Sequence, residues 1–435
     1  MRWYLGAIAI LLVALVFQLG LLAYAMYVLL GLMLLSRFVA RHWIENLSAT
    51  RECNRLSAEI GDKLAVVVTV LNSGKLPVAW TLVEDSLPRQ ALVQRPPRLK
   101  VHGRRLLVGM LKRGGKKALL YQVEFQMRGY YQIGPVILET GDLFGLHRRY
   151  RVATEPHFVL VYPKLVPLEG YDLASRRPVG EIRLTHRLYE DPTRIAGVRL
   201  YQPGDPLNRV NWRATARTGT LHSKIYEPST IAGATVLLSF HEQEYPKSNE
   251  PLRSELAVTT VASIANEVYL MGQQIGFATN GRDAADRIRQ EGWVHDFRTR
   301  AAAQKNANMT DRSERLQPVS VPTRRGPEQL WRILESLARV ELTDGLSFAQ
   351  LIGETVSRLP RDATVIAVLP AVSAETAFAL GSLKRRGYAV VAVLIMFNEF
   401  EFQDAAGRLL AQGIEARQVA DEASLSALCG QHLMR

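Results

Sequence analysis

The sequence predicts a membrane-anchored α+β multidomain protein, with an N-terminal transmembrane helical hairpin, a β-sandwich and a doubly wound α/β domain in this order. Three observations carry the prediction: a long uncharged run at the N-terminus, short apolar stretches in residues 51–165, and alternating strand and helix patterns in residues 233–435. A chain of 435 residues has room for these parts, because single cores rarely exceed about 250 to 300 residues.

Residues 1–37 are predicted to form the membrane hairpin. No charge occurs in residues 3–36. One helix of this length would reach about 50 Å, whereas the hydrocarbon core is about 30 Å thick. We therefore expect two helices, residues 3–17 and 21–36, joined by a turn at residues 18–20. A cleaved signal peptide is the alternative, but the run is too long and lacks a convincing cleavage site.

Basic residues flank the hairpin on both sides. Arg2 precedes it, and Arg37, Arg41 and Arg51 follow it. The positive-inside rule therefore places both ends, and the domains that follow, in the cytoplasm. The whole chain is basic too, with 54 Lys and Arg against 41 Asp and Glu and a net charge of +13. This balance favours anionic partners, namely phospholipid headgroups, nucleic acid or an acidic protein face.

Residues 48–165 are predicted to form the β-sandwich. Apolar stretches alternate with Gly, Pro and Asn at a spacing of about ten residues, which is typical of short strands and turns. The expected strands lie within residues 64–72, 78–85, 104–111, 117–127, 130–140 and 158–165. Between Arg128 and Leu146, the segments R-G-Y-Y-x-I-G-P and D-L-F-G-L are rich in glycine and aromatic residues. We interpret them as two strands joined by bends.

Residues 233–435 are predicted to form the doubly wound domain, because continuous apolar strands alternating with helices indicate a parallel sheet covered on both faces. Strands are expected at residues 234–240, 274–280, 364–370, 389–396 and 414–420, and helices at residues 252–271, 327–339, 347–358, 374–386 and 405–412. Residues 281–326 are polar and contain Pro318 and Pro322. We expect them to form an insertion or mobile loop.

No motif in the chain indicates a cofactor or a metal. The patterns GxGxxG, GxxxxGK[ST], HExxH and GxSxG are absent. The sequence therefore contains no motif for nucleotide binding, zinc proteolysis or serine hydrolysis. His241, Glu242 and Glu244 follow the first strand of the α/β domain, where such sheets place their sites. They could bind a cation, but a solvated loop is the more ordinary interpretation. Cys53 and Cys429 are too isolated for a disulfide framework or a zinc ribbon.

Residues 185–227, here called the arginine-rich segment, lie where the two soluble domains meet. Tyr201 and Trp212 occur among six arginines and one lysine. Three interpretations are open. Gly204 and Asp205 form a turn between two strands, Trp212 packs, and the arginines hold the junction. Alternatively, the guanidinium groups receive phosphate or acidic side chains. Binding of nucleic acid is the weakest of the three interpretations, because the chain has no recognisable nucleic-acid-binding fold.

The arginine-rich segment resembles the core of a bacterial family, domain of unknown function 58, which reads approximately G-x-R-x-Y-x-x-G-D-x-x-x-x-I-x-W-x-x-x-A-R-x-x-x-L-x-x-K. The matching residues are Gly197, Arg199, Tyr201, Gly204, Asp205, Trp212, Ala216, Arg217, Leu221 and Lys224, with Val210 in the isoleucine place. The order of parts is similar as well. The resemblance implies that the α/β domain is von Willebrand factor A-like.

The resemblance also implies partners. Family members resemble membrane-bound accessory proteins found with MoxR-type AAA+ ATPases and transglutaminase-like membrane proteins. Many von Willebrand-type domains bind a metal through D-x-S-x-S after the first strand, but the corresponding residues 239–243 read S-F-H-E-Q. Both the acidic ligand and the hydroxyl positions are missing, so we expect no bound magnesium.

We therefore expect a non-enzymatic inner-membrane scaffold or adaptor whose α/β domain docks a partner, with residues 166–232 as the signature region. In this hypothesis Asp205 fixes a turn and orients an arginine, and Trp212 anchors the segment. The residues expected to carry the interaction or the folding of the segment are Arg199, Asp205, Arg209, Trp212 and Arg217. The alternative is a hydrolase or transferase that uses the acids near Glu242 and Asp283.

Overall fold

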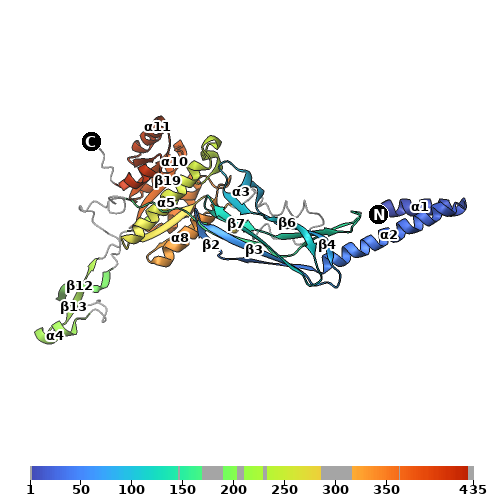
Figure 1. Cartoon of the computed structure of the whole chain (residues 1–435). Helices are drawn as coiled ribbons and strands as arrows, with labels where there is room; N and C mark the ends of the chain where they lie inside the picture. The colour runs from blue at the N-terminus through green and yellow to red at the C-terminus, as the bar shows by residue number, and fades with distance from the viewer. Residues whose placement is uncertain are drawn as a thin grey trace. The chain divides into compact units, whose positions relative to one another are not determined.

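The computed structural model of the chain describes residues 2–145, 147–168, 190–202, 210–228, 233–285, 316–361 and 363–429 (Figure 1). The chain forms two compact units. Unit 1 comprises Met1–Lys164, Gly281–Leu316 and Leu334–Gly345, and unit 2 comprises Leu165–Asn280, Gln317–Ile333 and Leu346–Arg435. Each unit contains a hydrophobic core of its own.

Two helices begin unit 1, namely α1 (Arg2–Val16) and α2 (Gly20–Glu45). The hydroxyl of Tyr4 donates to the carbonyl of Met33 at 3.0 Å, so the helices lie side by side. Helix α2 is long and apolar enough to cross a membrane, and α1 contributes a shorter apolar helix. The predicted end of the second helix at residue 36 was wrong, since α2 continues to Glu45. The first charged residues after the apolar run mark a more polar surrounding, but they do not end the helix.

Three β-sheets make up most of unit 1. Two have four strands, in the orders β1-β3-β7-β5 and β10-β9-β4-β6, and one has three, in the order β2-β11-β8. The strands are β1 (Leu47–Cys53), β2 (Ser57–Glu59), β3 (Lys63–Asn72), β4 (Val78–Asp85), β5 (Leu99–Gly103), β6 (Leu106–Leu111), β7 (Lys116–Phe125), β8 (Gly129–Ile133), β9 (Val136–Gly141), β10 (Arg148–Val152) and β11 (His157–Tyr162). A short helix, α3 (Arg89–Val93), lies between β4 and β5.

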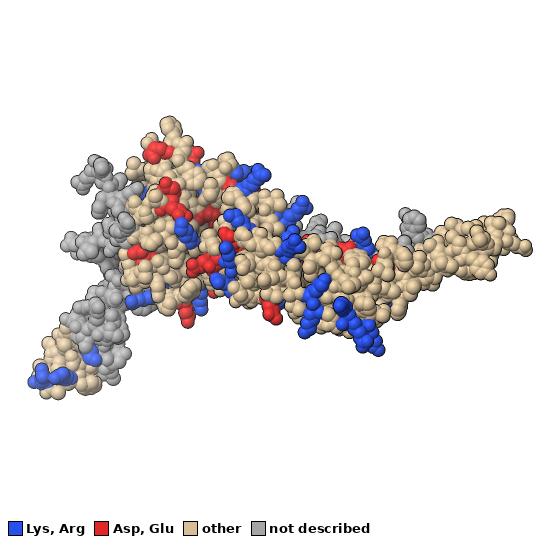
Figure 2. All heavy atoms as spheres, in the orientation of Figure 1, with Lys and Arg blue, Asp and Glu red and all other residues tan. Residues whose placement is uncertain are grey.

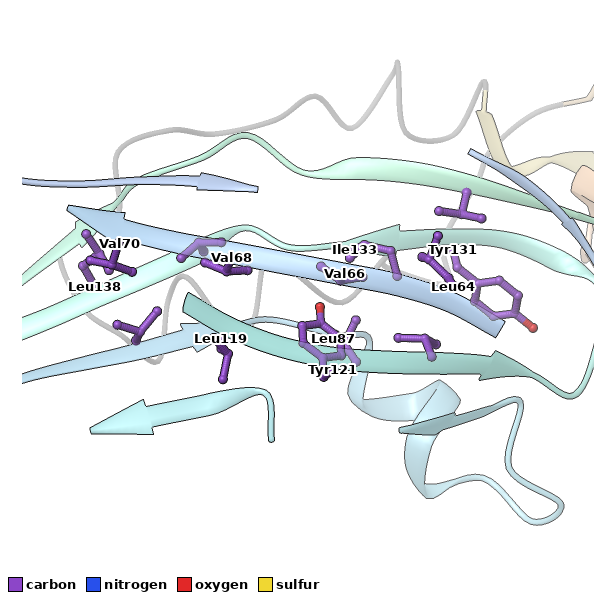
Figure 3. Packing of buried hydrophobic residues seen from close by; sticks show 14 of the residues in the cluster. Leu64, Val66, Val68, Val70, Leu87, Leu119, Tyr121, Tyr131, Ile133 and Leu138 are labelled. Carbon is purple, nitrogen blue, oxygen red and sulfur yellow. The ribbon is translucent and has the colours of Figure 1, made fainter. Parts of the chain in front are cut away.

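The two four-stranded sheets share one core. Buried and partly exposed residues alternate along β3, so that Leu64, Val66, Val68 and Val70 point to one side (Figure 3). Leu138 from the second sheet belongs to the same cluster. The alternation that predicted strands at residues 64–72 and 78–85 is thus the pattern of one buried face. The more polar strands β1, β2, β5 and β10 were not predicted, since they lack a continuous apolar stretch.

Unit 2 is built on a six-stranded sheet in the order β17-β15-β14-β19-β20-β21. Its strands are β14 (Gly233–Leu238), β15 (Gln274–Thr279), β17 (Val319–Arg324), β19 (Ala363–Leu369), β20 (Val390–Ile395) and β21 (Glu415–Val419). All neighbouring strands are parallel except β17, which is antiparallel to β15. Every residue of β14, β19 and β20 is buried, as expected for central strands covered on both faces.

Helices supply that cover. Alternate strand residues such as Val365, Ala367 and Leu369 share a core cluster with three helices, namely α9 (Phe348–Thr355), α10 (Ala374–Arg385) and α11 (Glu399–Leu410). Helix α5 (Leu252–Leu270) packs on β14, β15, β19 and β20 with a different set of buried side chains. Among the described residues, α12 (Glu422–Ser426) also belongs to unit 2, and α8 (Pro327–Arg339) begins in unit 2 and ends in unit 1. The predicted helices and strands of residues 327–420 are present with small shifts of their ends, except that α11 begins at Glu399, six residues before the predicted start.

The predicted insertion at residues 281–326 requires a correction. Its last part is β17, an edge strand of the sheet. Pro318 and Pro322 favoured a loop, but an edge strand tolerates proline because one side of its backbone has no strand partner. The insertion also begins with a two-residue strand, β16 (Arg282–Asp283), which pairs with β18 (Val340–Glu341). Residues 286–315 lie outside the described residues.

Candidate functional site

The described part of the arginine-rich segment is a two-stranded antiparallel sheet with a short helix between the strands. The strands are β12 (Glu190–Leu200) and β13 (His222–Pro228). Arg199 pairs with Ser223, and the backbone N–H of Tyr201 donates to the carbonyl of Leu221 at 2.9 Å. The structure thus brings Gly197, Arg199 and Tyr201 beside the strand that carries Lys224. Gly204, Asp205 and Arg209 lie outside the described residues, and so does the predicted turn.

Helix α4 (Trp212–Thr218) occupies the middle of the segment, and the sequence did not predict it. Asn211 caps its start, since its side chain accepts from the N–H of Ala214 at 3.2 Å. Gly219 ends it in the left-handed region, with φ of 72°. This Asn and Gly pair is a sequence signal that could have revealed the helix. A helix of seven residues is too short to show the repeat of apolar residues by which helices are predicted from sequence.

A contact with β13 orients α4. Thr215 lies toward β13, since its Oγ1 accepts from the N–H of His222 at 3.1 Å. Trp212 has 66% of its surface exposed, and no residue of α4 is buried. The expectation that Trp212 packs and anchors the segment was therefore wrong. Val210 and Ser223, which form a β-bridge, are the residues that become buried.

The outer face of α4 combines an aromatic ring with positive charge. Trp212, Arg213, Ala216 and Arg217 are all exposed. Ala216 is four positions from Trp212 and three from Arg213, and Arg217 is four from Arg213, so they are neighbours on the helix surface. Exposed apolar side chains also occur on β12, namely Val198 and Leu200, and just before β13, at Leu221. Blue side chains mark α4 in Figure 2. We call Trp212, Arg213, Ala216 and Arg217 the α4 face.

A second candidate site lies where β14 and β15 end. Ser239 Oγ donates to Glu244 Oε2 at 2.5 Å, and the hydroxyl of Tyr245 donates to the carbonyl of Ser239 at 2.8 Å. Asn280 Oδ1 accepts from the N–H of Phe240 at 2.7 Å. These hydrogen bonds between polar groups at the strand ends stabilise a turn. In this turn, the Ser239 hydroxyl and the Glu244 carboxylate are bonded to each other.

The predicted cation ligands do not converge on this turn. Glu244 turns toward Ser239, whereas Glu242 is exposed and the ring Nδ1 of His241 accepts from the N–H of Gln243 at 3.3 Å. Within the described ranges, no three His, Cys, Asp or Glu side chains are grouped so that they could hold a metal ion.

Glu244 is expected to make the stability of unit 2 depend on pH. Burial raises the pKa of Glu244 from its ordinary value of 4.5, and the bond from Ser239 opposes this only in part. The folded state thus holds the proton more tightly than the unfolded state. Its stabilising contribution is complete below pH 4.5 and is lost as the pH rises through the higher folded value. Glu244→Gln should abolish this loss, since the amide stays neutral.

The measurement is the melting temperature of the full chain in detergent from pH 4 to pH 8. The decline on raising the pH should be smaller in Glu244→Gln than in the wild type. Glu242→Gln, a change at an exposed neighbour, serves as the control and should keep the wild-type slope. Equal slopes in the wild type and Glu244→Gln would contradict the assignment.

The acids of the enzyme hypothesis are already engaged or solvated. Asp283 pairs with Arg339 at 3.3 Å and accepts from the N–H of Ala285 at 2.7 Å. Glu242 lies on a 3-10 turn and is exposed. A general acid or base needs a carboxylate that is free to meet a substrate. The described geometry of Asp283 gives that hypothesis no support.

Sequence reasoning missed a buried polar cluster in unit 1. Arg51 Nη1 lies 3.0 Å from Asp85 Oδ1, and both side chains have no exposed surface. Tyr121 donates its hydroxyl to the second Asp85 oxygen at 2.8 Å. Cys53 lies beside the cluster, and burial raises the pKa of its thiol. A thiol with a raised pKa is less nucleophilic near neutral pH, so the geometry indicates a structural cluster.

Comparison with known proteins finds a family model that includes most of the arginine-rich segment. Residues 197–326 match the family model described as "Protein of unknown function DUF58". The uncharacterized protein YeaD of Bacillus subtilis (strain 168) is 25% identical over 270 residues, which cover 62% of this chain. The chain spans 65% of the length of that relative.

Solved structures give only distant matches. The CARDB domain of the PF1109 protein from Pyrococcus furiosus has a TM-score of 0.19 and 15% identity, covering 26% of this chain and 86% of its own. Proximal thread matrix protein 1 from the mussel byssus has a TM-score of 0.29 and 10% identity, covering 46% of each chain. These scores carry no argument about fold or function. On the family model and the Bacillus relative, residues 197–326 of this chain belong to the DUF58 family.

Proposed function

We propose that this protein is a non-enzymatic membrane scaffold or adaptor that docks a partner protein through the α4 face. The observation that carries the proposal is the 66% exposure of Trp212 on the same short helix as two exposed arginines, Arg213 and Arg217. Tryptophan and arginine are the residues most enriched where binding energy concentrates in protein interfaces. An acidic surface on the partner would complement Arg213 and Arg217.

The proposed setting is the cytoplasmic face of a bacterial inner membrane, with both α1 and α2 crossing the bilayer. The apolar character of the two helices and the basic residues Arg2, Arg37 and Arg41 support this orientation. In the proposed layout, a β-sandwich of residues 48–165 follows the anchor, and a von Willebrand factor A-like domain occupies residues 233–435. The sheet order of unit 2, with a single antiparallel edge strand, supports the latter assignment.

The proposed partner is a MoxR-type AAA+ ATPase, and a transglutaminase-like membrane protein is the second member of the proposed assembly. Both follow from the family resemblance. The basic α4 face supports an acidic docking surface on the ATPase.

Trp212→Ala in the full-length protein is expected to weaken binding to a purified MoxR-type ATPase from the same genome by about 30-fold, the effect of a typical hot spot. Arg217→Glu should weaken it as well, because the charge is reversed. Binding is measured by biolayer interferometry with the full chain in nanodiscs. Two matched controls on exposed residues elsewhere, Phe400→Ala and Arg104→Glu, should bind like the wild type.

Hydrogen exchange of β12 and β13 in each variant separates a lost contact from a lost fold. Unchanged exchange with weakened binding supports docking by the α4 face. Wild-type affinity in Trp212→Ala and Arg217→Glu would contradict it, and no binding by the wild-type chain would remove the ATPase as the partner.

A further inference from the structure

The turn at residues 142–145, between β9 and β10, holds two large apolar side chains in an exposed position. Leu143 is 71% exposed and Phe144 is 60% exposed. The carboxylate of Asp142 organises the turn, because it accepts from the N–H of Phe144 at 3.0 Å and from the N–H of His147 at 2.6 Å. The exposure is therefore a property of a hydrogen-bonded turn.

Further contacts hold the turn on the sheet. Trp80 donates its indole N–H to the carbonyl of Asp142 at 3.3 Å, and Gly145 takes the left-handed conformation with φ of 73°. At Gly141 a Cβ atom would come within 2.6 Å of the carbonyl of His147. The D-L-F-G-L pattern in the sequence thus encodes a tight turn whose two apolar side chains point away from the core. Adjacent exposed apolar residues of this size mark an interaction surface.

His147, just after the turn, is bonded to both N-terminal helices. Its Nε2 lies 3.1 Å from the hydroxyl of Tyr4 on α1, and its Nδ1 lies 3.1 Å from Ser36 Oγ on α2. Tyr4 donates its own proton to the carbonyl of Met33, so its oxygen remains to accept from Nε2 while Ser36 donates to Nδ1. One ring thereby fixes the turn against the helix pair.

This contact sets the height of the turn along α2. Ser36 is the last residue of the uncharged run, and Arg37 follows it. Such a change from apolar to basic residues marks the level at which a helix leaves the hydrocarbon core and enters the headgroup layer. The helix pair carries no charged side chain on most of the face drawn in Figure 2. The turn therefore lies at the level of the membrane interface.

The end of α2 is also fixed to the sheets. Arg151 on β10 donates to the carbonyls of Glu45 at 3.0 Å and of Leu47 at 3.1 Å. Arg148, at the start of β10 beside the turn, lies 3.6 Å from the Glu139 carboxylate with its Nη1 and keeps 63% of its side chain exposed. Exposed apolar side chains next to a basic residue are the combination that interfacial membrane segments use, with the apolar groups in the acyl boundary and the charge among anionic headgroups.

We propose that the turn at residues 142–145 inserts Leu143 and Phe144 into the interface of the bilayer that α2 crosses. The inference rests on the proposed membrane anchorage and adds a contact on the sheet itself. Because the sheets are fixed to the helices, the helices alone would leave the whole of unit 1 free to tilt and rotate with them in the bilayer. The turn adds a third contact with the bilayer, away from the axes of the two helices. This contact determines which face of the unit 1 sheets is turned toward the lipid.

The test measures the depth of a spin label in the full chain. Cys53→Ala and Cys429→Ala remove the native thiols, and Phe144→Cys carries the label in nanodiscs of phosphatidylethanolamine and phosphatidylglycerol. Leu143→Cys is a second site in case one label disturbs the turn. Val28→Cys on α2 is the bilayer reference and Phe400→Cys on α11 the aqueous reference, since these side chains are 72% and 82% exposed.

Power saturation with oxygen and a soluble nickel complex gives the depth of each label. Labels at 143 and 144 are expected to be more accessible to oxygen than to nickel, as at Val28 and opposite to Phe400. Labels that behave like Phe400 while Val28 is in the bilayer would overturn the inference and leave the anchorage intact. A label immobilised only on adding the ATPase would also overturn it, by assigning the turn to a protein partner. An aqueous label at Val28 would overturn the anchorage itself, together with the inference.

Discussion

Arg51→Met is expected to lower the free energy of unfolding of the sheet core of unit 1 by about 3 to 5 kcal/mol, the usual cost of leaving one partner of a buried ion pair alone. Arg51 and Asp85 are separated by 3.0 Å, and neither side chain has exposed surface. Methionine replaces the aliphatic part of Arg51 but leaves the Asp85 carboxylate with the hydroxyl of Tyr121 as its remaining cluster partner.

Hydrogen exchange of the full chain in detergent measures this effect locally, since a chain with two units need not unfold in one step. Peptides from β1, β4 and β7 should exchange about two to four orders of magnitude faster in Arg51→Met, at 1.36 kcal/mol for each tenfold change. Peptides from β14 and β19 in unit 2 serve as the internal reference. The double variant Arg51→Met with Asp85→Leu should recover most of the protection from hydrogen exchange, because it also removes the unpaired buried carboxylate. Wild-type exchange in the single variant would contradict the prediction.

Arg128→Met is expected to destabilise the end of α8 by about 3 to 6 kcal/mol, because two charge-assisted hydrogen bonds contribute about 1.5 to 3 kcal/mol each. Arg128 Nη1 donates at 2.8 Å to the carbonyl of Leu337 and at 2.8 Å to that of Val340. The last carbonyls of a helix lack partners within it, and they lie at the negative end of the helix dipole. The buried guanidinium group of Arg128 supplies hydrogen-bond donors and a positive charge at this helix end, within unit 1.

The measurement is again hydrogen exchange, now of the peptide that contains residues 334–341. Arg128→Lys should lose part of the effect only, since a single ammonium keeps the charge but not the fork of donors. Arg113→Met, at an exposed arginine, is the matched control and should exchange like the wild type. If Arg128→Met and Arg113→Met exchange alike, the proposed role of Arg128 is wrong.

Positions of helices and strands were predictable where one physical pattern dominates. The alternation of Leu64, Val66, Val68 and Val70 identified β3, because one face of that strand is buried. The continuous apolar run of β19 identified a strand covered on both faces. Edge strands were less visible: β17 contains a proline, and its place in the sheet depends on pairing with β15, which lies far away in the sequence.

The candidate site was located from the sequence but not oriented. Spacing of glycine, tryptophan and arginine identified residues 197–224, and the family match confirms that region. Whether Trp212 packs or faces solvent depends on the rotation of α4, which the Asn211 cap and the contact of Thr215 with β13 decide. A seven-residue helix has no apolar stripe from which its inner face could be read.

By itself, the sequence determined the apolar N-terminal helices, the order of sheet-rich and α/β parts and the family of residues 197–326, because each depends on local pattern or spacing. Only the tertiary structure decided that Arg51 meets Asp85, that Arg128 caps α8 and that Leu143 and Phe144 stand exposed beside the N-terminal helices. These contacts join residues separated by up to hundreds of positions, and no local propensity encodes the pairing of groups so far apart.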